Sequence, residues 1–237
     1  MGLGWKDPRI VVYRAMIRTL RTVHAQSIVL ENVPRLLTHD GGKTMKKILK
    51  QLAKCGYACT VKVFNSFDFG LPQQRRRLYI IGLRDQVPIV PDTPMIMPPP
   101  IAQFLDADRA AVGTLPTGKT ARHNLKKVLK KLEAQGVDHT TQTWILDIDG
   151  SAEYVQGKLN VSPTMTYARA MGFWLTSHRR RMNAQEQFRL QGFPVHDIIP
   201  LVSRTNMGRL AGNSMSVPIL THIFDALLPQ LGINAIS

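Results

Sequence analysis

The sequence predicts an α/β fold, because helical and strand patterns alternate along its first third. Residues 7–24 place apolar side chains near one helical face, with arginines around the other. Residues 27–30 form a short β-branched run that stops at polar residues and a proline, as a buried strand does. We expect the order helix, strand, helix, strand, loop, strand, with mostly parallel pairing and a hairpin at one edge.

The next elements follow from the same patterns. Residues 42–54 are predicted to form a helix with an apolar stripe and a lysine-rich, solvent-facing side, and Gly56 is a plausible residue to end it. Residues 57–65 alternate in the manner of a strand, and residues 77–83 are apolar enough to be a buried strand. These residues, with the helix before them, give a predicted domain over 1–85.

The character of the chain changes after Val87, where six prolines fall within 13 residues and mark an irregular linker. A lysine-rich helix is expected near 120–135, either on DNA phosphates or simply solvated, and a strand over 143–149. We therefore predict a separate small module over 86–160. The remainder, 161–237, is predicted to return to the domain formed by residues 1–85.

Two features are expected in the last segment. Asn183 is placed to cap a helix that begins AQEQFRL, with Glu186 at the third helical position of a capping box. That helix ends at Gly192, and a final apolar helix is expected over 214–231.

Composition favours a polyanionic partner. The 237 residues carry a net charge of +15 and a pI near 10.3, which favours nucleic acid. No apolar run approaches 18 residues and the N-terminus lacks an apolar signal core, so neither a membrane span nor a secretion signal is expected. Cys55 and Cys59 cannot make a disulfide framework and are a poor zinc signal, so a reducing compartment and no metal site are expected.

Four short motifs occur in a fixed order: LENV at 30–33, PQQRRR at 72–77, RLQGFP at 189–194 and GNSMSVP at 212–218. Each alone is weak, but the series resembles the C-terminal two-thirds of a DNA (cytosine-5) methyltransferase. The resemblance covers about 1–85 and 160–230. It implies a partial Rossmann-like methyltransferase sheet, with a small target-recognition module where the proline-bounded segment lies.

The resemblance implies a chemistry for these motifs. In this family a cysteine thiolate adds to cytosine C6, and the activated ring takes a methyl group from S-adenosylmethionine. Negative charge builds on the ring and must be stabilised at N3 and O2, and the base must leave the helix of double-stranded DNA. Glu31 would contact N3 and the exocyclic amine, and it must carry a proton to donate to N3. Asn32 and Val33 would line the same substrate site.

The arginine run is assigned by the family pattern Q-x-R-x-R, which falls on Gln73, Arg75 and Arg77. Alternate residues of an extended segment point the same way. The resemblance therefore puts Arg77 at cytosine O2, Arg75 near the same pocket and Gln73 beside the substrate. Arg76 should meet solvent or phosphate.

The remaining assignments concern the cofactor and DNA. Asn213, Ser214 and Met215 resemble the cofactor-side motif, expected at a helix N-terminus that offers free N–H groups. An ordinary helix cap is the alternative. His178 and the arginines that follow it are expected to contact DNA phosphates; these arginines are Arg179, Arg180 and Arg181.

The chain also lacks two family motifs, the Pro-Cys nucleophile and the glycine-rich F-x-G-x-G loop. Alone it should be inactive and leave the strand at 27–30 with an unpaired edge. A second polypeptide could supply the N-terminal half, or the reading frame could be truncated.

A non-catalytic DNA-binding module and a tRNA methyltransferase are the alternative functions. A cytoplasmic or nucleoid location is expected (nuclear in a eukaryote), and a restriction–modification role stays open.

Overall fold

The computed structural model describes residues 10–111, 114–151, 157–194 and 198–233. They form two compact units. Among the described residues, unit 1 comprises 10–64, 76–93 and 220–233, and unit 2 comprises 65–75 together with the described parts of 94–219. These units divide the chain differently from the predicted segments, because residues 161–219 group with the middle module and the chain returns to unit 1 at Leu220.

Unit 1 contains a three-stranded sheet in the order β1-β3-β2. Its strands are β1 (Ser27–Asn32), β2 (Tyr57–Asn65) and β3 (Arg76–Arg84). All three were predicted. The expectation of mostly parallel pairing is wrong for β1 and β3, which pair antiparallel from Ser27↔Leu83 to Asn32↔Leu78. The apolar run of β3 is buried because this strand lies between the other two, and β1 lies at one edge of the three.

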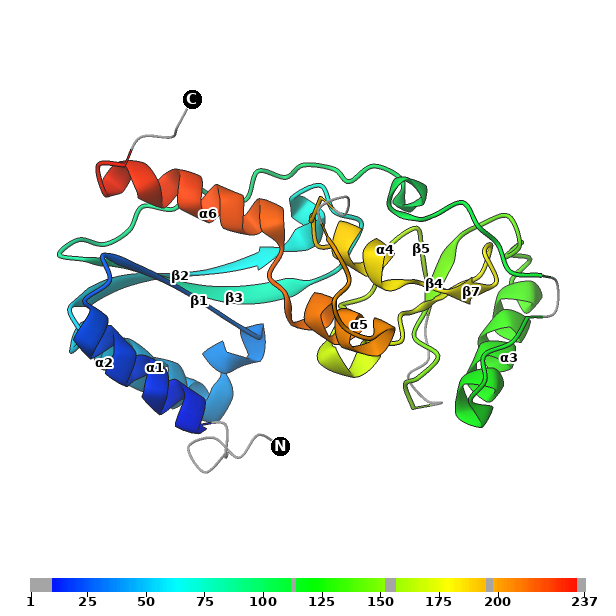
Figure 1. The fold of residues 1–237 in the computed structure, drawn as a ribbon, viewed down its shortest axis with the longest axis horizontal. Helices are drawn as coiled ribbons and strands as arrows, with labels where there is room; N and C mark the ends of the chain where they lie inside the picture. Colours follow the sequence, from blue (N-terminus) through cyan, green and yellow to red (C-terminus); the bar gives the residue numbers. More distant parts are fainter. Residues whose placement is uncertain (1–9, 112–113, 152–156, 195–197, 234–237) are drawn as a thin grey trace. The chain divides into compact units, whose positions relative to one another are not determined.

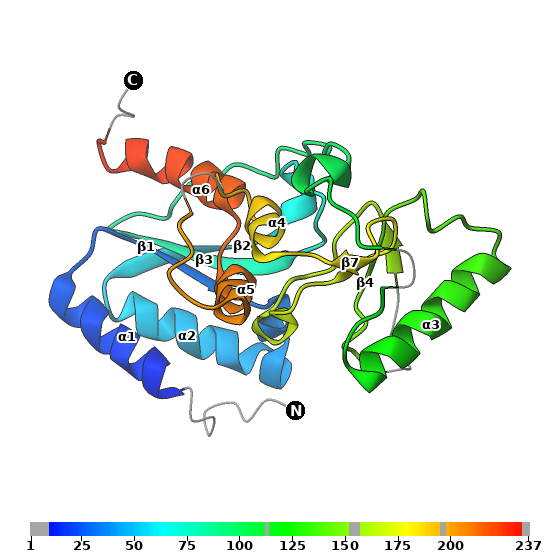
Figure 2. The same ribbon diagram turned by 45° about the vertical axis from the view of Figure 1, so that its right-hand side comes forward.

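Helices cover both faces of this sheet, as Figures 1 and 2 show. On one face lie α1 (Ile10–Val23) and α2 (Lys43–Ala53), and on the other lies α6 (Val217–Gln230). The apolar stripes of α1 and α2 meet the sheet in one core, which includes Ile17, Leu20, Ile28, Ile48, Leu52 and Ile80. The helix expected over 7–24 is confirmed from residue 10, and residues 7–9 lie outside the described residues.

Unit 2 contains a second, antiparallel sheet in the order β5-β4-β6-β7. Its strands are short: β4 (Trp144–Leu146), β5 (Gly157–Leu159), β6 (Trp174–Leu175) and β7 (Arg180–Arg181). Helix α3 (Lys119–Ala134) buries Leu125, Val128 and Leu132 against this sheet's Leu146 and Trp174 and leaves its lysines exposed. The expected strand at 143–149 is therefore present but shorter.

The capping box before α4 (Ala184–Arg189) is confirmed. The Asn183 side chain accepts from the Glu186 N–H, and the Glu186 carboxylate accepts from the Asn183 N–H at 2.7 Å. Each side chain thereby satisfies a backbone donor that the first turn of a helix leaves without a partner.

The helix expected over 214–231 is confirmed as α6 (Val217–Gln230). A further helix, α5 (Arg204–Asn213), precedes it and was not predicted. Two glycines give α5 a poor helical pattern, and both are needed for packing. A Cβ at Gly208 would overlap the Ala170 backbone, and one at Gly212 would overlap the Thr166 backbone.

Among the described residues, none of the helices has the length and apolar character needed to cross a membrane.

Candidate active site

The antiparallel register of unit 1 brings Glu31 and Arg77 together. Glu31 pairs with Tyr79 across the two strands, so Arg77 is its diagonal neighbour on the same face. The Arg77 Nε lies 2.8 Å from the Glu31 Oε1, and the two side chains are 12% and 21% exposed. A half-buried carboxyl group and a half-buried guanidinium thus meet where β1 ends and β3 begins.

The residues after Glu31 are open to solvent. Asn32 ends β1 with its side-chain oxygen accepting from the Val33 N–H at 2.9 Å, and both residues are exposed. Pro34 then begins a short 3-10 helix. A ligand beside Glu31 could therefore reach these two residues without unfolding the strand.

The three consecutive arginines have three different environments. Arg77 pairs with Glu31, Arg76 is exposed, and Arg75 is buried with 2% of its surface exposed. Because side chains alternate in direction along an extended segment, the Arg76 side chain points away from those of Arg75 and Arg77, as expected. Arg75 and Arg77 nevertheless have different partners, because Arg75 precedes β3 and belongs to unit 2.

Arg75 holds three backbone carbonyl groups within unit 2. Its Nη1 donates to the oxygens of Met165 at 2.6 Å and Gly212 at 3.2 Å, and its Nη2 donates to the oxygen of Ser214 at 2.8 Å. The planar guanidinium fork can reach several acceptors at once, which an ammonium group cannot. Arg75 therefore ties the PQQRRR segment to the GNS segment.

Two glutamines complete these links between motifs. The buried Gln73 donates from Nε2 to the Leu190 oxygen at 2.7 Å. Gln191 donates from Nε2 to the Ala211 carbonyl oxygen at 3.1 Å, and the backbone carbonyl oxygen of Gln191 accepts from the Val217 N–H at 2.8 Å. Three of the four sequence motifs are thus joined by hydrogen bonds inside unit 2, and LENV is joined to the arginine run by the ion pair in unit 1.

Comparison with known proteins identifies the family of this chain. The family described as "C-5 cytosine-specific DNA methylase" matches residues 2–228, which is nearly the whole chain. The chain belongs to the C-5 cytosine-specific DNA methylase family.

Relatives are similar over nearly all of this methylase-family chain. It is 32% identical to the Type II methyltransferase M.NgoBI of Neisseria gonorrhoeae over 92% of its length, and 29% identical to M.HaeII of Haemophilus aegyptius over 97%. It spans 66% and 69% of those two proteins and 58% of M1.ScrFI of Lactococcus lactis. The chain therefore corresponds to about two thirds, or less, of the curated relatives it matches.

Solved structures show the same fold at low sequence identity. The Entamoeba histolytica methyltransferase EhMeth aligns with a TM-score of 0.63 at 17% identity, covering 95% of this chain and 70% of that protein. The S. pombe Dnmt2 methyltransferase aligns with a TM-score of 0.58 at 20% identity, covering 98% and 75%. A Rossmann-like methyltransferase fold for this methylase chain follows.

The expected cofactor residues of this methylase chain do not begin a helix, contrary to the sequence prediction. Asn213 is the last residue of α5, and Ser214 follows it as the C-cap, three residues before α6 begins. The Ser214 hydroxyl donates to the Ala211 oxygen at 2.8 Å, and its carbonyl accepts from Arg75. Asn213 is exposed and Met215 is half-buried. The cofactor-binding role of these residues stays a prediction.

The basic run at 178–181 is mostly engaged inside unit 2. Arg180 pairs with the fully buried Glu186 at 2.7 Å and with Asp108 at 3.0 Å, and Arg181 pairs with Asp149 at 2.7 Å. Arg179 donates from Nε to the Ala110 oxygen at 3.2 Å. Sequence reasoning missed these carboxylate partners, because Asp108 and Asp149 lie 72 and 32 residues from the arginines they contact, and Glu186 was assigned only to the helix cap.

His178 is also unsuited to a charged phosphate contact. Its burial and the neighbouring Arg180 lower the pKa of this imidazole, which favours the neutral form at pH 7. His178 instead lies 3.0 Å from the Ser177 hydroxyl through its Nδ1.

The two cysteines are thiols in unit 1. Cys55 is buried in the core between the helices and the sheet, and Cys59 lies half-buried on β2. Burial raises the pKa of the Cys59 thiol to about 11, so this thiol carries little thiolate at neutral pH.

Proposed function

We propose that this chain provides the cytosine-binding and DNA-recognition parts of a DNA (cytosine-5) methyltransferase. The reaction transfers a methyl group from S-adenosylmethionine to C5 of a cytosine flipped out of double-stranded DNA. The observation that carries the proposal is the pair formed by Glu31 and Arg77, with 2.8 Å between the Arg77 Nε and the Glu31 Oε1. Family membership and a net charge of +15 support it.

The pair suits the edge of a pyrimidine. Glu31 offers carboxyl oxygens that can accept from the exocyclic amine of cytosine and, when protonated, donate to N3. Arg77 offers N–H donors for O2, where negative charge develops during nucleophilic attack on the ring. The ion pair holds both groups in position before the base enters, so little reorganisation is needed at the moment of reaction.

Arg75 is proposed as a positioning residue. Its hydrogen bonds to the carbonyl groups of Met165, Gly212 and Ser214 fix the segments on which the recognition unit is built. It precedes Arg77 by two residues, so a fixed Arg75 also limits the freedom of the backbone leading into β3. Gln73 has the same role through Leu190.

DNA contacts are proposed for the exposed Arg76 and for Arg179, whereas Arg180 and Arg181 are held by carboxylates and stabilise unit 2. The nucleophile is proposed to come from a Pro-Cys pair outside the present sequence, on the same or on a second polypeptide, because neither cysteine of this chain follows a proline. The segment that carries this pair would also supply the glycine-rich part of the cofactor site.

The test is the transfer of tritiated methyl groups from S-adenosylmethionine. The chain is assayed with and without a polypeptide that carries the Pro-Cys pair and the glycine-rich loop, on duplex DNA and on tRNA. We expect label in DNA 5-methylcytosine when both polypeptides are present. Glu31→Gln should abolish transfer and leave duplex binding nearly unchanged.

The matched control is Glu133→Gln, which makes the same change at an exposed glutamate of α3 and should retain full activity. Label in tRNA alone would assign the chain to RNA modification. Duplex binding without transfer to either substrate would assign it a non-catalytic role. Full transfer by Glu31→Gln would refute the role of Glu31.

A further inference from the structure

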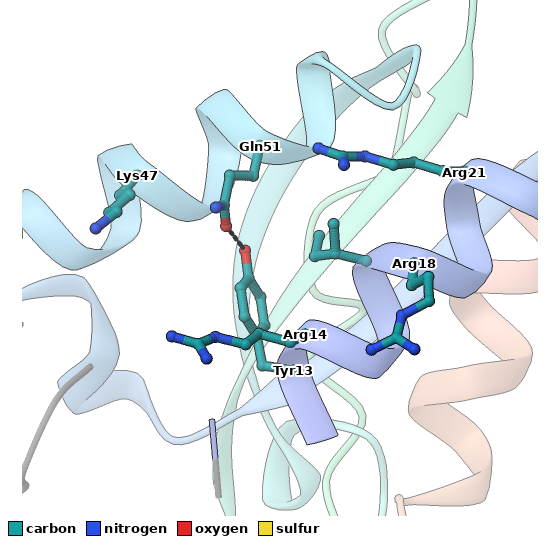
Figure 3. A pocket seen from close by; sticks show the side chains of 7 residues that line it. Tyr13, Arg14, Arg18, Arg21, Lys47 and Gln51 are labelled. Carbon is teal, nitrogen blue, oxygen red and sulfur yellow. Dashed lines mark hydrogen bonds between the residues drawn. The ribbon is translucent and has the colours of Figure 1, made fainter. Parts of the chain in front are cut away.

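A basic groove lies between α1 and α2 in unit 1, apart from the residues of the proposed cytosine site. We call it the α1–α2 groove. It encloses about 380 Å³ and is lined by Tyr13, Arg14, Ile17, Arg18, Arg21, Lys47 and Gln51. Figure 3 shows these side chains arising from two neighbouring helices.

The charged side chains among the described residues that line the groove are all basic. Arg14, Arg18, Arg21 and Lys47 are all exposed, and neither α1 nor α2 contains an aspartate or a glutamate. An exposed cluster of basic side chains attracts an anionic ligand.

The groove also has a defined floor. The Tyr13 hydroxyl donates to the Gln51 Oε1 at 2.5 Å and so bridges the two helices, while Ile17 is buried beneath. Burial, with a smaller contribution from Cys55, raises the pKa of Tyr13 to about 12, so the floor stays neutral. In Figure 3 Arg14 and Lys47 point to one side of this bridge, and Arg21 reaches toward α2 on the other.

The distance between the arginines determines how long a ligand must be to contact all of them. Arg14, Arg18 and Arg21 recur at intervals of four and three residues, which places them along one helical face. Arg14 and Arg21 are seven residues apart, or about 10 Å along the helix axis. A single phosphate group cannot contact both, whereas successive phosphates of a nucleic-acid backbone can.

We propose that the α1–α2 groove binds the phosphate backbone of double-stranded DNA, as a second DNA-binding surface in addition to the site of Glu31 and Arg77. Arginine forks and a lysine bind phosphate oxygens without reading the base sequence. The groove thereby adds affinity for DNA of any sequence. Duplex binding by this groove can be measured without methyl transfer. A result against the groove would therefore leave the proposed function untouched, and the reverse also holds.

The first test measures the salt dependence of duplex binding. One variant carries Arg14→Gln, Arg18→Gln, Arg21→Gln and Lys47→Gln. The matched control removes the same charge from exposed residues of α2 and its C-cap that do not line the groove, with Lys43→Gln, Lys46→Gln, Lys50→Gln and Lys54→Gln. Fluorescence anisotropy with a 30-base-pair duplex is recorded from 50 to 300 mM salt, and circular dichroism checks that both variants fold.

Each phosphate contact contributes about 0.9 to the slope of log K against log salt concentration, so the groove variant should lose about 3 to 4 from that slope. We expect the control to lose less than about 1, because its residues do not line the groove. Equal losses in the two variants would show that only net charge matters and would overturn the proposal.

The second test locates the duplex directly. Lysines are acetylated with and without bound duplex, and the modification of Lys47 and Lys54 is compared by mass spectrometry. We expect the duplex to protect Lys47 and leave Lys54, which is exposed but does not line the groove, reactive. Failure to protect Lys47, or protection by an acidic peptide but not by DNA, would overturn the proposal and, in the second case, assign the groove to a protein partner.

Discussion

Arg75 offers the sharpest test of how the arginine run is used. Replacing it with alanine removes hydrogen bonds of 2.6, 3.2 and 2.8 Å to three carbonyl groups of unit 2. Hydrogen bonds from charged donors contribute about 1.5–3 kcal/mol each, and leaving buried acceptors without partners adds to the loss. Because single substitutions rarely cost more than about 5 kcal/mol, we expect Arg75→Ala to lower the free energy of unfolding by about 3–5 kcal/mol.

Urea denaturation followed by tryptophan fluorescence measures this loss, since the buried Trp174 lies in unit 2. With a slope of about 2 kcal/mol per molar urea, the midpoint should fall by roughly 1.5–2.5 M. Arg75→Lys retains the positive charge but not the planar guanidinium with its several N–H donors. Its urea midpoint should therefore lie between those of Arg75→Ala and the wild type.

Arg76→Ala is the matched control. Arg76 is exposed and adjacent in sequence, so its loss should change stability by no more than about 0.5 kcal/mol. Equal midpoints for Arg75→Ala and Arg76→Ala would refute the assignment of Arg75 as the residue that holds unit 2 together.

Three further results are expected. Gly212→Ala should destabilise unit 2 by about 1–3 kcal/mol or more in the same urea assay, because its Cβ would overlap the Thr166 backbone, whereas Gly136→Ala has open space around it and strains only a positive φ. Cys59 should react with iodoacetamide at pH 8 about 200 times more slowly than a thiol of pKa 8.5, since a pKa of about 11 leaves about 0.1% thiolate, and the rate should rise as the pH approaches 11. Asn183→Ala should cost about 1 kcal/mol through loss of the helix cap, and no change in the urea midpoint would contradict the role of the capping box.

The sequence pattern correctly predicted those structural elements that are determined by residues close together in the chain. The bounds of β2 follow from alternation, and the capping box at Asn183 follows from spacing, because neighbouring residues determine both. The apolar run of β3 correctly indicated a buried strand. Its place between β1 and β2, and the antiparallel pairing with β1, depend on contacts across some 50 residues that no local pattern encodes.

The site was predictable in part for the same reason. The resemblance paired Glu31 with Arg77, and the register of β1 and β3 brings them together. The partners of Arg75 lie 90 to 139 residues further along the chain, so sequence spacing could not separate its surroundings from those of Arg77. Helix α5 was missed because the glycines that allow its close packing also weaken its helical pattern.

The central claim is that Glu31 and Arg77 together hold the edge of one cytosine. The most direct measurement compares kcat/KM for DNA methyl transfer by Arg77→Ala and Arg76→Ala in the two-polypeptide enzyme. Loss of a donor that stabilises developing charge should lower kcat/KM by roughly 10²- to 10³-fold for Arg77→Ala, and Arg76→Ala should lose far less. Equal losses in the two variants would contradict the account.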